Sequence, residues 1–560
     1  MRIRTCLASI IAAVAVASAA AAQEPPDTPK GTGSIAGRVT AGDTGRPIPG
    51  ATVTTISWDS MRMAKIARTD ADGRYELTGL PAGRFEFSVE APGYLAWQLG
   101  NPLREGVPPV DVEDGARVKA ADVVMCRPGA IEGVLLDEFG DPAPNVSVQV
   151  ARLQFAAGRK RLMPVGGGAA RITDDRGHFR VTGLAPDSYY VLALTGAFAG
   201  SSDAGGAADT EGPAWFAQTY YPGTAEVGDA QRIAVKRGET ADGVGFSLVP
   251  ARTVDVSGTV VDGEGLPAAR SSVLLSVRDS LGSVEFLTAR TGGGANGRFK
   301  FRNLSPGVYT IQAWGRPITQ AGNLNSAEFG WLPLNVAGSE VTGLVVRTSR
   351  NAAARGRVVF EEGAVPPIPF RQVRVAGRPV EFDSAPIAGG PSPTTMNEDG
   401  TFEIQNLSGH WVIRPDVTSA DWTLKKVTLG GKDVTDVPIE FKDKDVDGLE
   451  VVLTTRNPSL GGAVLDDRGR AIGNFSVIVF AADSRRWTFP SRFVALGRPS
   501  QQGRYKVGGL PPEDYLVVAV PPITGGEWQD PEFLESLRPL AQPVTLVEGD
   551  AKSIDLRLKR

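Results

Sequence analysis

The sequence predicts an all-β chain, a tandem array of five β-sandwich domains with one short helix near the C-terminus. A stretch at 73–85 (GRYELTGLPAGRF) holds two strands of alternating apolar and polar residues, separated by a turn rich in Gly and Pro. The same pattern returns at 177–186, 297–307, 400–407 and 503–511. The chain also contains 67 Gly and 41 Pro alongside 42% hydrophobic residues, a composition typical of short strands and frequent turns around apolar cores.

Successive copies of the pattern lie about 100 to 120 residues apart, a period the size of a domain rather than of a solenoid repeat. This spacing divides the 560 residues into a leader, a linker and five sandwiches. We expect a signal peptide at 1–22, a Pro-rich linker at 23–32, and β-sandwiches at 33–126, 127–251, 252–349, 350–456 and 457–560.

Each repeat begins with an alternating strand that has Gly near its middle, and a turn and a second strand follow before the central hairpin. Gly at a fixed point of a strand indicates a bulge or the close approach of another backbone. A final strand closes each repeat. The expected opening strands are 35–39, 131–135, 256–260, 354–358 and 460–464; the second strands are 49–53, 144–148, 272–275, 372–375 and 475–479; the closing strands are 121–125, 244–248, 344–346, 449–453 and 554–558.

The central hairpin places one aromatic residue at the same position in every repeat. Because successive side chains of a strand point to opposite faces, these aromatics should point into the core and the charged residues after them should point outward. The expected inward residues are Tyr75, Phe179, Phe299, Phe402 and Tyr505, and the outward ones are Glu76, Arg180, Lys300, Glu403 and Lys506.

One short helix is expected in the fifth repeat. Asp530 can cap it and Pro531 fits its first turn, while Pro539 ends it. The apolar stripe of this helix consists of Phe533, Leu534 and Leu537.

The N-terminus has the three parts of a secretory signal. Arg2 and Arg4 are basic, residues 7–16 are apolar, and a run of Ala at 20–22 precedes Gln23. The apolar run is too short and too rich in Ala for a membrane span, which needs about 20 strongly apolar residues. Cleavage near Ala22-Gln23 leaves Cys126 as the one cysteine of the mature chain, so we expect no intrachain disulfide. We expect a secreted or periplasmic bacterial protein without a transmembrane segment in the mature chain.

These motifs carry a resemblance to a known family. The Gly-x-Val opening strand (37–39), the Pro-x-x-x-Val turn and strand (49–53) and the Asp-x-x-Gly-x-Tyr hairpin (70–75) resemble the carboxypeptidase regulatory-like domain. That family has a transthyretin-like, starch-binding-like β-sandwich, which is also similar to the B-type repeats of collagen adhesins. The resemblance covers nearly all of the mature chain and is weaker in the fourth repeat, where 408–411 (SGHW) replaces a Pro-Gly-x-Tyr end. It implies a fold and an extracytoplasmic setting, and by itself no reaction.

Residues that commonly carry enzyme chemistry are scarce. The two His, His178 and His410, stand in different registers of the hairpin, whereas a zinc site needs three or four converging ligands. The sequence has no nucleophile elbow and no Ser or Cys with a neighbouring His. We therefore expect no enzyme, no catalytic residues, no metal site and no cofactor.

Two charged runs could bind a ligand. Residues 443–448 (DKDVDG) copy the first half of a calcium loop, but Thr454 stands where such a loop has a bidentate Glu, which favours an acidic turn. Residues 159–161 (RKR) form the most basic run of a chain with a net charge of −4. We interpret this run as a solvated loop and expect no nucleic-acid partner.

Ligand contact is expected at an aromatic cluster of the second repeat, formed by Trp215, Phe216, Tyr220 and Tyr221. At most one of the two neighbouring Tyr can serve the core, because adjacent strand residues point to opposite faces. The other Tyr or Trp215 should then form a partly exposed platform. The alternative is that these aromatics seal the junction between the second and third sandwiches.

The sequence thus favours an exported, non-catalytic, multidomain binding or structural protein of the bacterial cell envelope, which presents loops to another macromolecule. The alternative is a carbohydrate-binding protein that uses exposed Trp or Tyr, because a flat aromatic ring covers the apolar face of a sugar. The expected partner is accordingly a carbohydrate or another envelope protein.

Overall fold

The computed structural model describes residues 31–57, 62–99, 110–119, 122–156, 158–165, 171–198, 216–279, 282–292, 294–315, 328–361, 368, 370, 373–381, 384–386, 391, 394–417, 422–500, 503–523 and 526–559. This part of the chain is mostly β-strand, with one short α-helix near the C-terminus. The expected all-β fold class is therefore confirmed. The signal sequence and its cleavage site lie outside the described residues and stay predictions.

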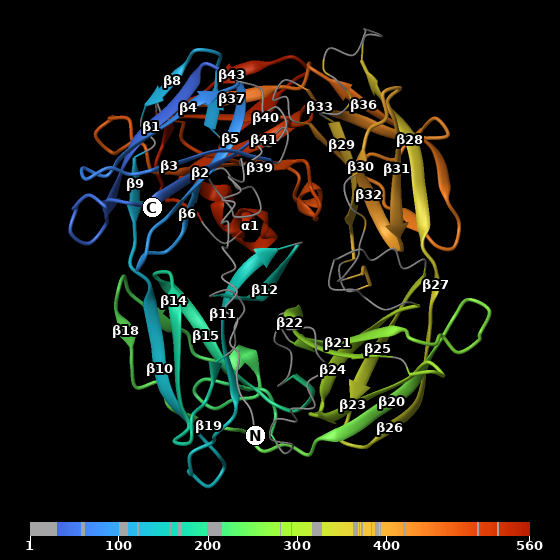
Figure 1. Ribbon diagram of the computed structural model, residues 1–560. Coiled ribbons are helices and arrows are strands. Elements are labelled where there is room, and N and C mark those ends of the chain that lie inside the picture. Colours follow the sequence, from blue (N-terminus) through green and yellow to red (C-terminus); the bar gives the residue numbers. More distant parts are fainter. Residues whose placement is uncertain are drawn as a thin grey trace, which may run out of the picture.

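Among the described residues, ten β-sheets form as five consecutive pairs along the chain. We name the pairs units 1 to 5, and they consist of strands β1–β9, β10–β19, β20–β27, β28–β36 and β37–β44. Figure 1 shows the units arranged around a ring, with the sheet of the opening strand on the outside in units 2, 3 and 4. The division into five domains at the boundaries given above stays a prediction.

Units 1 and 2 have the same plan. The first sheet has the order β4-β1-β8 in unit 1 and β14-β10-β18 in unit 2, and the second has the order β3-β2-β5-β6 or β12-β11-β15-β16. The strands of unit 1 are β1 (Gly33–Ala41), β2 (Thr52–Ser57), β3 (Arg62–Arg68), β4 (Arg74–Leu80), β5 (Gly83–Glu90), β6 (Trp97–Leu99), β7 (Val110–Val112), β8 (Arg117–Lys119) and β9 (Val123–Met125). The elements of unit 2 are β10 (Gly129–Leu136), β11 (Ser147–Ala156), β12 (Arg159–Pro164), β13 (Arg171–Ile172), β14 (His178–Leu184), β15 (Asp187–Leu194), η1 (Gly196–Phe198), β16 (Thr219–Tyr220), η2 (Val227–Asp229), β17 (Ile233–Val235), β18 (Thr240–Ala241) and β19 (Phe246–Ser247).

Units 3 and 4 differ from each other in which of their two sheets the additional strands join. Unit 3 pairs the sheet β23-β20-β26 with β22-β21-β24-β25-β27, and unit 4 pairs β31-β28-β36-β33-β34 with β30-β29-β32-β35. The strands of unit 3 are β20 (Val254–Val261), β21 (Ser272–Asp279), β22 (Gly282–Gly292), β23 (Arg298–Leu304), β24 (Gly307–Trp314), β25 (Glu328–Val336), β26 (Val341–Arg347) and β27 (Ser349–Arg350). The strands of unit 4 are β28 (Ala352–Phe360), β29 (Val373–Pro379), β30 (Thr394–Thr395), β31 (Thr401–Leu407), β32 (Gly409–Val417), β33 (Thr423–Leu429), β34 (Lys432–Asp433), β35 (Ile439–Phe441) and β36 (Val446–Thr454).

Unit 5 adds the helix to the sandwich. Its sheets have the orders β40-β37-β43 and β39-β38-β41-β42. The elements are β37 (Ser459–Leu465), β38 (Ser476–Ala481), η4 (Ser484–Trp487), β39 (Val494–Gly497), β40 (Arg504–Gly508), β41 (Glu513–Val520), η5 (Glu527–Gln529), α1 (Pro531–Leu537), η6 (Arg538–Leu540), β42 (Gln542–Leu546), β43 (Ala551–Ser553) and β44 (Leu556–Arg557). As expected, Asp530 caps α1, because its Oδ1 accepts a hydrogen bond from the Glu532 backbone N–H at 3.0 Å. Leu534 and Leu537 are buried, and Phe533 packs against the same core.

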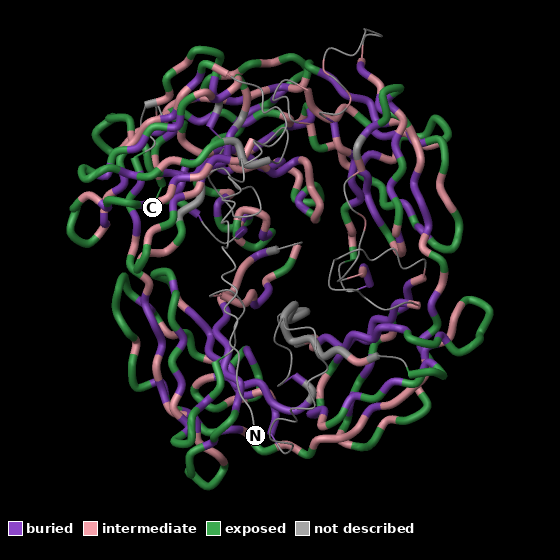
Figure 2. Tube along the Cα trace, in the orientation of Figure 1, coloured by how far each residue is buried: buried purple, intermediate pink, exposed green. Residues whose placement is uncertain are grey.

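The hairpin register expected from the sequence is confirmed in all five units. The five inward aromatics are buried and the charged residues that follow them are exposed. Each aromatic lies opposite the Gly of the opening strand in the antiparallel pair, as Phe179 lies opposite Gly133. Figure 2 shows the resulting alternation of buried and exposed positions along the outer strands.

The Gly of the opening strand allows another backbone to come close. A Cβ at Gly133 would lie 1.7 Å from the carbonyl oxygen of Val244, and one at Gly258 would lie 2.4 Å from that of Leu344. Leu344 lies in the closing strand β26 and Val244 lies just before the closing strand β19, and both of these strands run parallel to their opening strands. The close approach expected from the sequence is therefore confirmed, and any larger residue would separate the two strands.

The fourth repeat keeps its hairpin structure although its sequence departs from the others. The hydroxyl groups of Tyr189, Tyr309 and Tyr515 donate to the carbonyl oxygen four residues earlier, at 2.6, 2.7 and 2.8 Å. In unit 4, Trp411 stands at this point, and its Nε1 donates to the carbonyl oxygen of Ser408 at 2.8 Å. The indole thus replaces the phenol in the same role.

Candidate functional site

The predicted aromatic cluster is divided between two buried regions. Trp215 lies outside the described residues. Phe216 is buried in the core of unit 2, and Tyr221 packs partly buried against that core, with its ring 6.0 Å from and nearly perpendicular to that of Phe246. Tyr220 is 3% exposed and belongs to a different buried cluster, which joins residues of unit 2 with residues of unit 3.

The opposite orientation of Tyr220 and Tyr221 was expected. We expected Trp215 or one of the two Tyr to be partly exposed, with sealing of the junction between the second and third sandwiches as the alternative. Tyr221 is partly exposed, whereas Tyr220 is buried in the cluster that units 2 and 3 share. The ligand-binding role of Trp215, Phe216, Tyr220 and Tyr221 stays a prediction. For Tyr220, binding would require the junction to open.

Trp331 is the most exposed Trp side chain among the described residues. It is 42% exposed on β25, whereas Trp314, Trp411 and Trp487 are buried and the described rings of Trp422 and Trp528 are partly buried. A sugar platform requires an accessible ring face. Among the Trp rings whose exposure the structure describes, Trp331 is therefore the best placed for such a contact.

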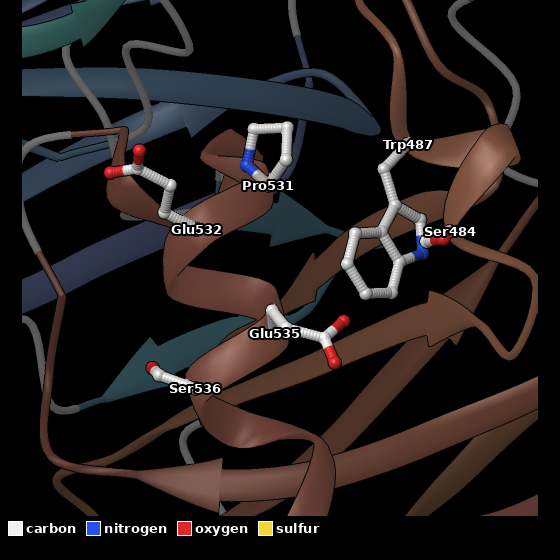
Figure 3. A pocket seen from close by; sticks show the side chains of 6 residues that line it. All are labelled: Ser484, Trp487, Pro531, Glu532, Glu535 and Ser536. Carbon is white, nitrogen blue, oxygen red and sulfur yellow. The ribbon is translucent and has the colours of Figure 1, made fainter.

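A hollow of about 690 Å³ lies beside α1 in unit 5 (Figure 3). Ser484 and Trp487 from η4 form one wall. The lining residues from α1 are Pro531, Glu532, Glu535 and Ser536. Figure 3 shows Glu535 reaching toward the Trp487 ring, while Glu532 points away from it. The hollow therefore combines an aromatic wall with an acidic rim.

Short-range contacts hold the aromatic wall in place. The indole Nε1 of Trp487 donates to the carbonyl oxygen of Ala481 at 2.8 Å, and its ring packs edge-on against Phe480. The Arg538 guanidinium lies 5.0 Å from the centre of the same ring and donates to Glu535 at 3.0 Å. Glu535 is thus already paired, and the Ser536 hydroxyl donates to the carbonyl oxygen of Phe533 at 2.6 Å, so the neutral polar groups of the lining are Ser484 and the acceptor oxygen of Ser536. The arrangement suits a ligand with a flat apolar face and a few polar groups.

The local sequence patterns do not indicate this hollow. The signal available was the spacing of Glu532 and Glu535, three residues apart and therefore on one side of the expected helix. The packing of η4 against α1 depends on contacts between segments about 40 residues apart, and no local pattern shows it.

The acidic turn at 443–448 is used by the chain itself. Asp445 accepts hydrogen bonds from the backbone N–H of Ala353 and from the guanidinium groups of Arg350 and Arg355, each at 3.0 Å. These donors hold the pKa of Asp445 below its usual value, with the Ala353 N–H as the largest cause. Both carboxylate oxygens therefore have partners from the strand that opens unit 4.

The two histidines lie apart from each other. His178 on β14 contacts Glu132 on β10, with Nε2 3.0 Å from Oε1, and His410 lies on β32 of unit 4. Within the described residues, no three His, Cys, Asp or Glu side chains converge as metal ligands would. Cys126 has a free thiol.

The interpretation of residues 159–161 as a solvated loop is wrong. These residues begin strand β12, and Arg161 is almost fully buried. The Lys160 ammonium contacts Asp530 and Glu532 of unit 5, at 3.3 and 3.1 Å. The run was misjudged because its partners belong to a part of the chain more than 350 residues away, as the 372-residue separation of Lys160 and Glu532 shows.

Comparison with known families supports the resemblance seen in the motifs. Residues 34–125, which cover unit 1, match the family described as the carboxypeptidase regulatory-like domain. No curated protein matches the chain. The family resemblance is confirmed for this β-sandwich.

Solved structures of three bacterial proteins show similarity to parts of the chain. One is the Bacillus anthracis TIE protein, at 12% identity, covering 73% of this chain and 69% of that one with a TM-score of 0.15. A second is a streptococcal ancillary pilin, at 13% identity, covering 57% of this chain and 99% of that one with a TM-score of 0.18. A third is the minor pilin of Streptococcus agalactiae, at 12% identity, covering 39% and 95% with a TM-score of 0.21.

In the portion of the chain that the structure describes, no helix has the length and apolar character that crossing a bilayer requires.

Proposed function

We propose that this chain is an exported, non-catalytic scaffold of the bacterial cell envelope, which holds loops in fixed positions for another macromolecule. The observation that carries the proposal is the buried cluster common to units 2 and 3. Modules that share a core keep one relative orientation, whereas independent modules reorient freely. A fixed orientation allows loops of different units to contact one partner at the same time.

The loops between strands are the surfaces offered in this proposal. Phe139 stands in the turn after β10 and is 81% exposed, and Leu266 is exposed in the turn after β20. Asp137 and Asp262 fix these turns, because each accepts hydrogen bonds from two backbone N–H groups of its own turn. Rigid turns with exposed apolar side chains lose little conformational freedom when they bind.

Photo-crosslinking in intact cells tests the scaffold. A crosslinking amino acid at Phe139 should capture an envelope macromolecule, while the same residue at Val345, exposed on the strand β26, should capture much less. Equal capture at both positions would contradict presentation by loops. A cytoplasmic location of the full chain would contradict export.

A second candidate function is carbohydrate recognition, which the exposed ring of Trp331 favours. Soluble envelope glycans should then quench Trp fluorescence of the mature chain, and Trp331→Ala should abolish the response. Trp314→Phe, in the buried core, serves as the control that keeps Trp331. A glycan response that survives Trp331→Ala would exclude this ring as the contact.

A further inference from the structure

Units 2 and 5 are not neighbours in the sequence, yet they touch. The hairpin of β11 and β12 in unit 2 reaches the start of α1 in unit 5, and Lys160 and Glu532 are 372 residues apart. Figure 1 shows β12 and α1 facing each other near the centre of the ring. The chain already joins units 2 to 3, 3 to 4 and 4 to 5, so this contact closes four units into a ring.

The contact is mainly ionic. The Lys160 ammonium lies 3.1 Å from Oε2 of Glu532 and 3.3 Å from Oδ2 of Asp530. The Asp530 side chain is 11% exposed and also caps α1, so its position is fixed. The pKa of Lys160 is raised because its ammonium donates hydrogen bonds to Glu532 and Asp530, which stabilise the charged form. The hairpin is therefore tied by charge to the first turn of the helix.

The apolar part of the contact is small. The backbone of Gly158, at the turn of the hairpin, lies against Phe489 of unit 5, where an added Cβ would be 2.7 Å from the Phe489 Cβ. The junction of units 2 and 3 differs, because there a whole cluster of aromatic and aliphatic side chains is buried. The contact between units 2 and 5 therefore relies on charge, like the junction of units 4 and 5 and unlike the apolar junction of units 2 and 3.

We propose that this contact is an ionic latch, at which the ring opens and closes while units 2 and 3 stay joined through their shared core. Screening of the charges, or loss of the Lys160 ammonium, shifts the ring toward the open form. Two partly exposed ion pairs of this kind together change a two-state ratio by roughly 2- to 30-fold. Opening also frees Glu532, which lines the hollow beside α1, so the latch changes the charge of that hollow's rim.

The distance between units 2 and 5 tests the latch directly. Nitroxide labels are attached to the full mature chain at the exposed positions Ile172→Cys and Val547→Cys, in a Cys126→Ser background. Double electron–electron resonance should give one narrow distribution of the distance between the two labels at 50 mM NaCl. At 1 M NaCl a second, longer and broader population should appear, because salt screens exposed charges.

Variants separate the latch from general effects of charge. Lys160→Glu should produce the long population already at 50 mM NaCl, and adding Glu532→Lys should partly restore the narrow one. Lys236→Glu is the matched control, because Lys236 pairs only weakly with Glu239 of its own unit, at 3.6 Å on the surface.

Two results would overturn the latch. One is an unchanged narrow distance both in Lys160→Glu and at 1 M NaCl. The other is a broad distance in the wild-type chain at 50 mM NaCl. If Lys160→Glu loses the near-ultraviolet circular dichroism of the folded protein, the salt series on the chain with Lys160 decides alone.

Discussion

Units 2 and 3 meet through apolar side chains, whereas units 4 and 5 meet through charges. At the first junction, the Phe198 ring of η1 stacks on Tyr309 of unit 3, with ring centres 6.3 Å apart and planes 9° from parallel. Leu162, Tyr220 and Val227 of unit 2 are buried in the same cluster as the core of unit 3. The two sandwiches therefore share one hydrophobic core.

Units 4 and 5 keep separate cores and are connected by ion pairs. Arg492 of unit 5 lies 3.0 Å from Asp436 of unit 4, which also pairs with Arg414 of its own unit at 2.9 Å. Lys425 of unit 4 contacts Glu548 of unit 5 at 3.2 Å and Glu361 within unit 4.

The difference shows that one kind of module can be joined in two ways with different consequences. Apolar burial is insensitive to salt screening and couples the folding of the units that share it. Exposed or half-buried ion pairs contribute little each and weaken as salt rises. We therefore expect units 2 and 3 to unfold together and units 4 and 5 to separate more easily.

The largest effect is expected from truncation at the apolar junction. Phe198→Ala removes a buried ring from the shared cluster. Such a truncation should lower the free energy of unfolding by roughly 3–5 kcal/mol. Both units 2 and 3 should lose stability in denaturant titrations of the full chain. Phe402→Ala is the control, because its cluster lies within unit 4 alone. A loss confined to unit 2 in Phe198→Ala would contradict the shared core.

The structure of each unit was predictable from the sequence, because alternation, turn residues and caps are local signals. The inward ring of Phe299, the close approach at Gly258 and the cap at Asp530 all follow from positions in short patterns. Asn303 shows the same, since its φ of 55° is positive at a position where the first, second and fifth repeats have Gly and the fourth has Asn406.

The junctions were not predictable in the same way. Tyr220 and Lys160 make their decisive contacts with units 3 and 5, and the relative orientation of units depends on side chains far apart in the sequence. Gly196 illustrates this, because a Cβ there would lie 2.1 Å from the carbonyl oxygen of Asn303 in unit 3. In the sequence Gly196 is only the first residue of a Gly- and Ala-rich segment.

A smaller effect is expected at the ionic junction. Arg492→Ala removes one of two partners of the half-buried Asp436 and should cost about 1–2 kcal/mol at low salt. The cost should shrink at 1 M NaCl, because salt weakens the pair in the wild-type chain. Arg485→Ala, which breaks a surface pair with Asp483 inside unit 5, should change stability by less than about 0.5 kcal/mol. A cost of Arg492→Ala independent of salt would argue against an ionic junction.

The smallest expected effect is the pH dependence of the melting temperature at Asp445. Because the pKa of Asp445 is lowered in the folded chain, its stabilising contribution is complete above the unfolded-state value of about 3.9 and disappears as the pH falls through the folded value. Asp445→Asn should therefore lower the melting temperature of unit 4 by a few degrees, roughly, at pH 7 and by less below pH 4. If the difference in melting temperature between the wild-type chain and Asp445→Asn grew on acidification, it would contradict the assigned ion pairs.

Hydrogen exchange of the full mature chain, followed by mass spectrometry in a denaturant series, tests the contrast between the two junctions most directly. Exchange from slow amides reports the free energy of the opening that exposes them. At both 50 mM and 1 M NaCl, amides of β15 in unit 2 and β24 in unit 3 should share one opening free energy. Amides of β32 in unit 4 and β41 in unit 5 should open in separate steps at 1 M NaCl. Separate opening of units 2 and 3, with units 4 and 5 still opening together at high salt, would contradict the account.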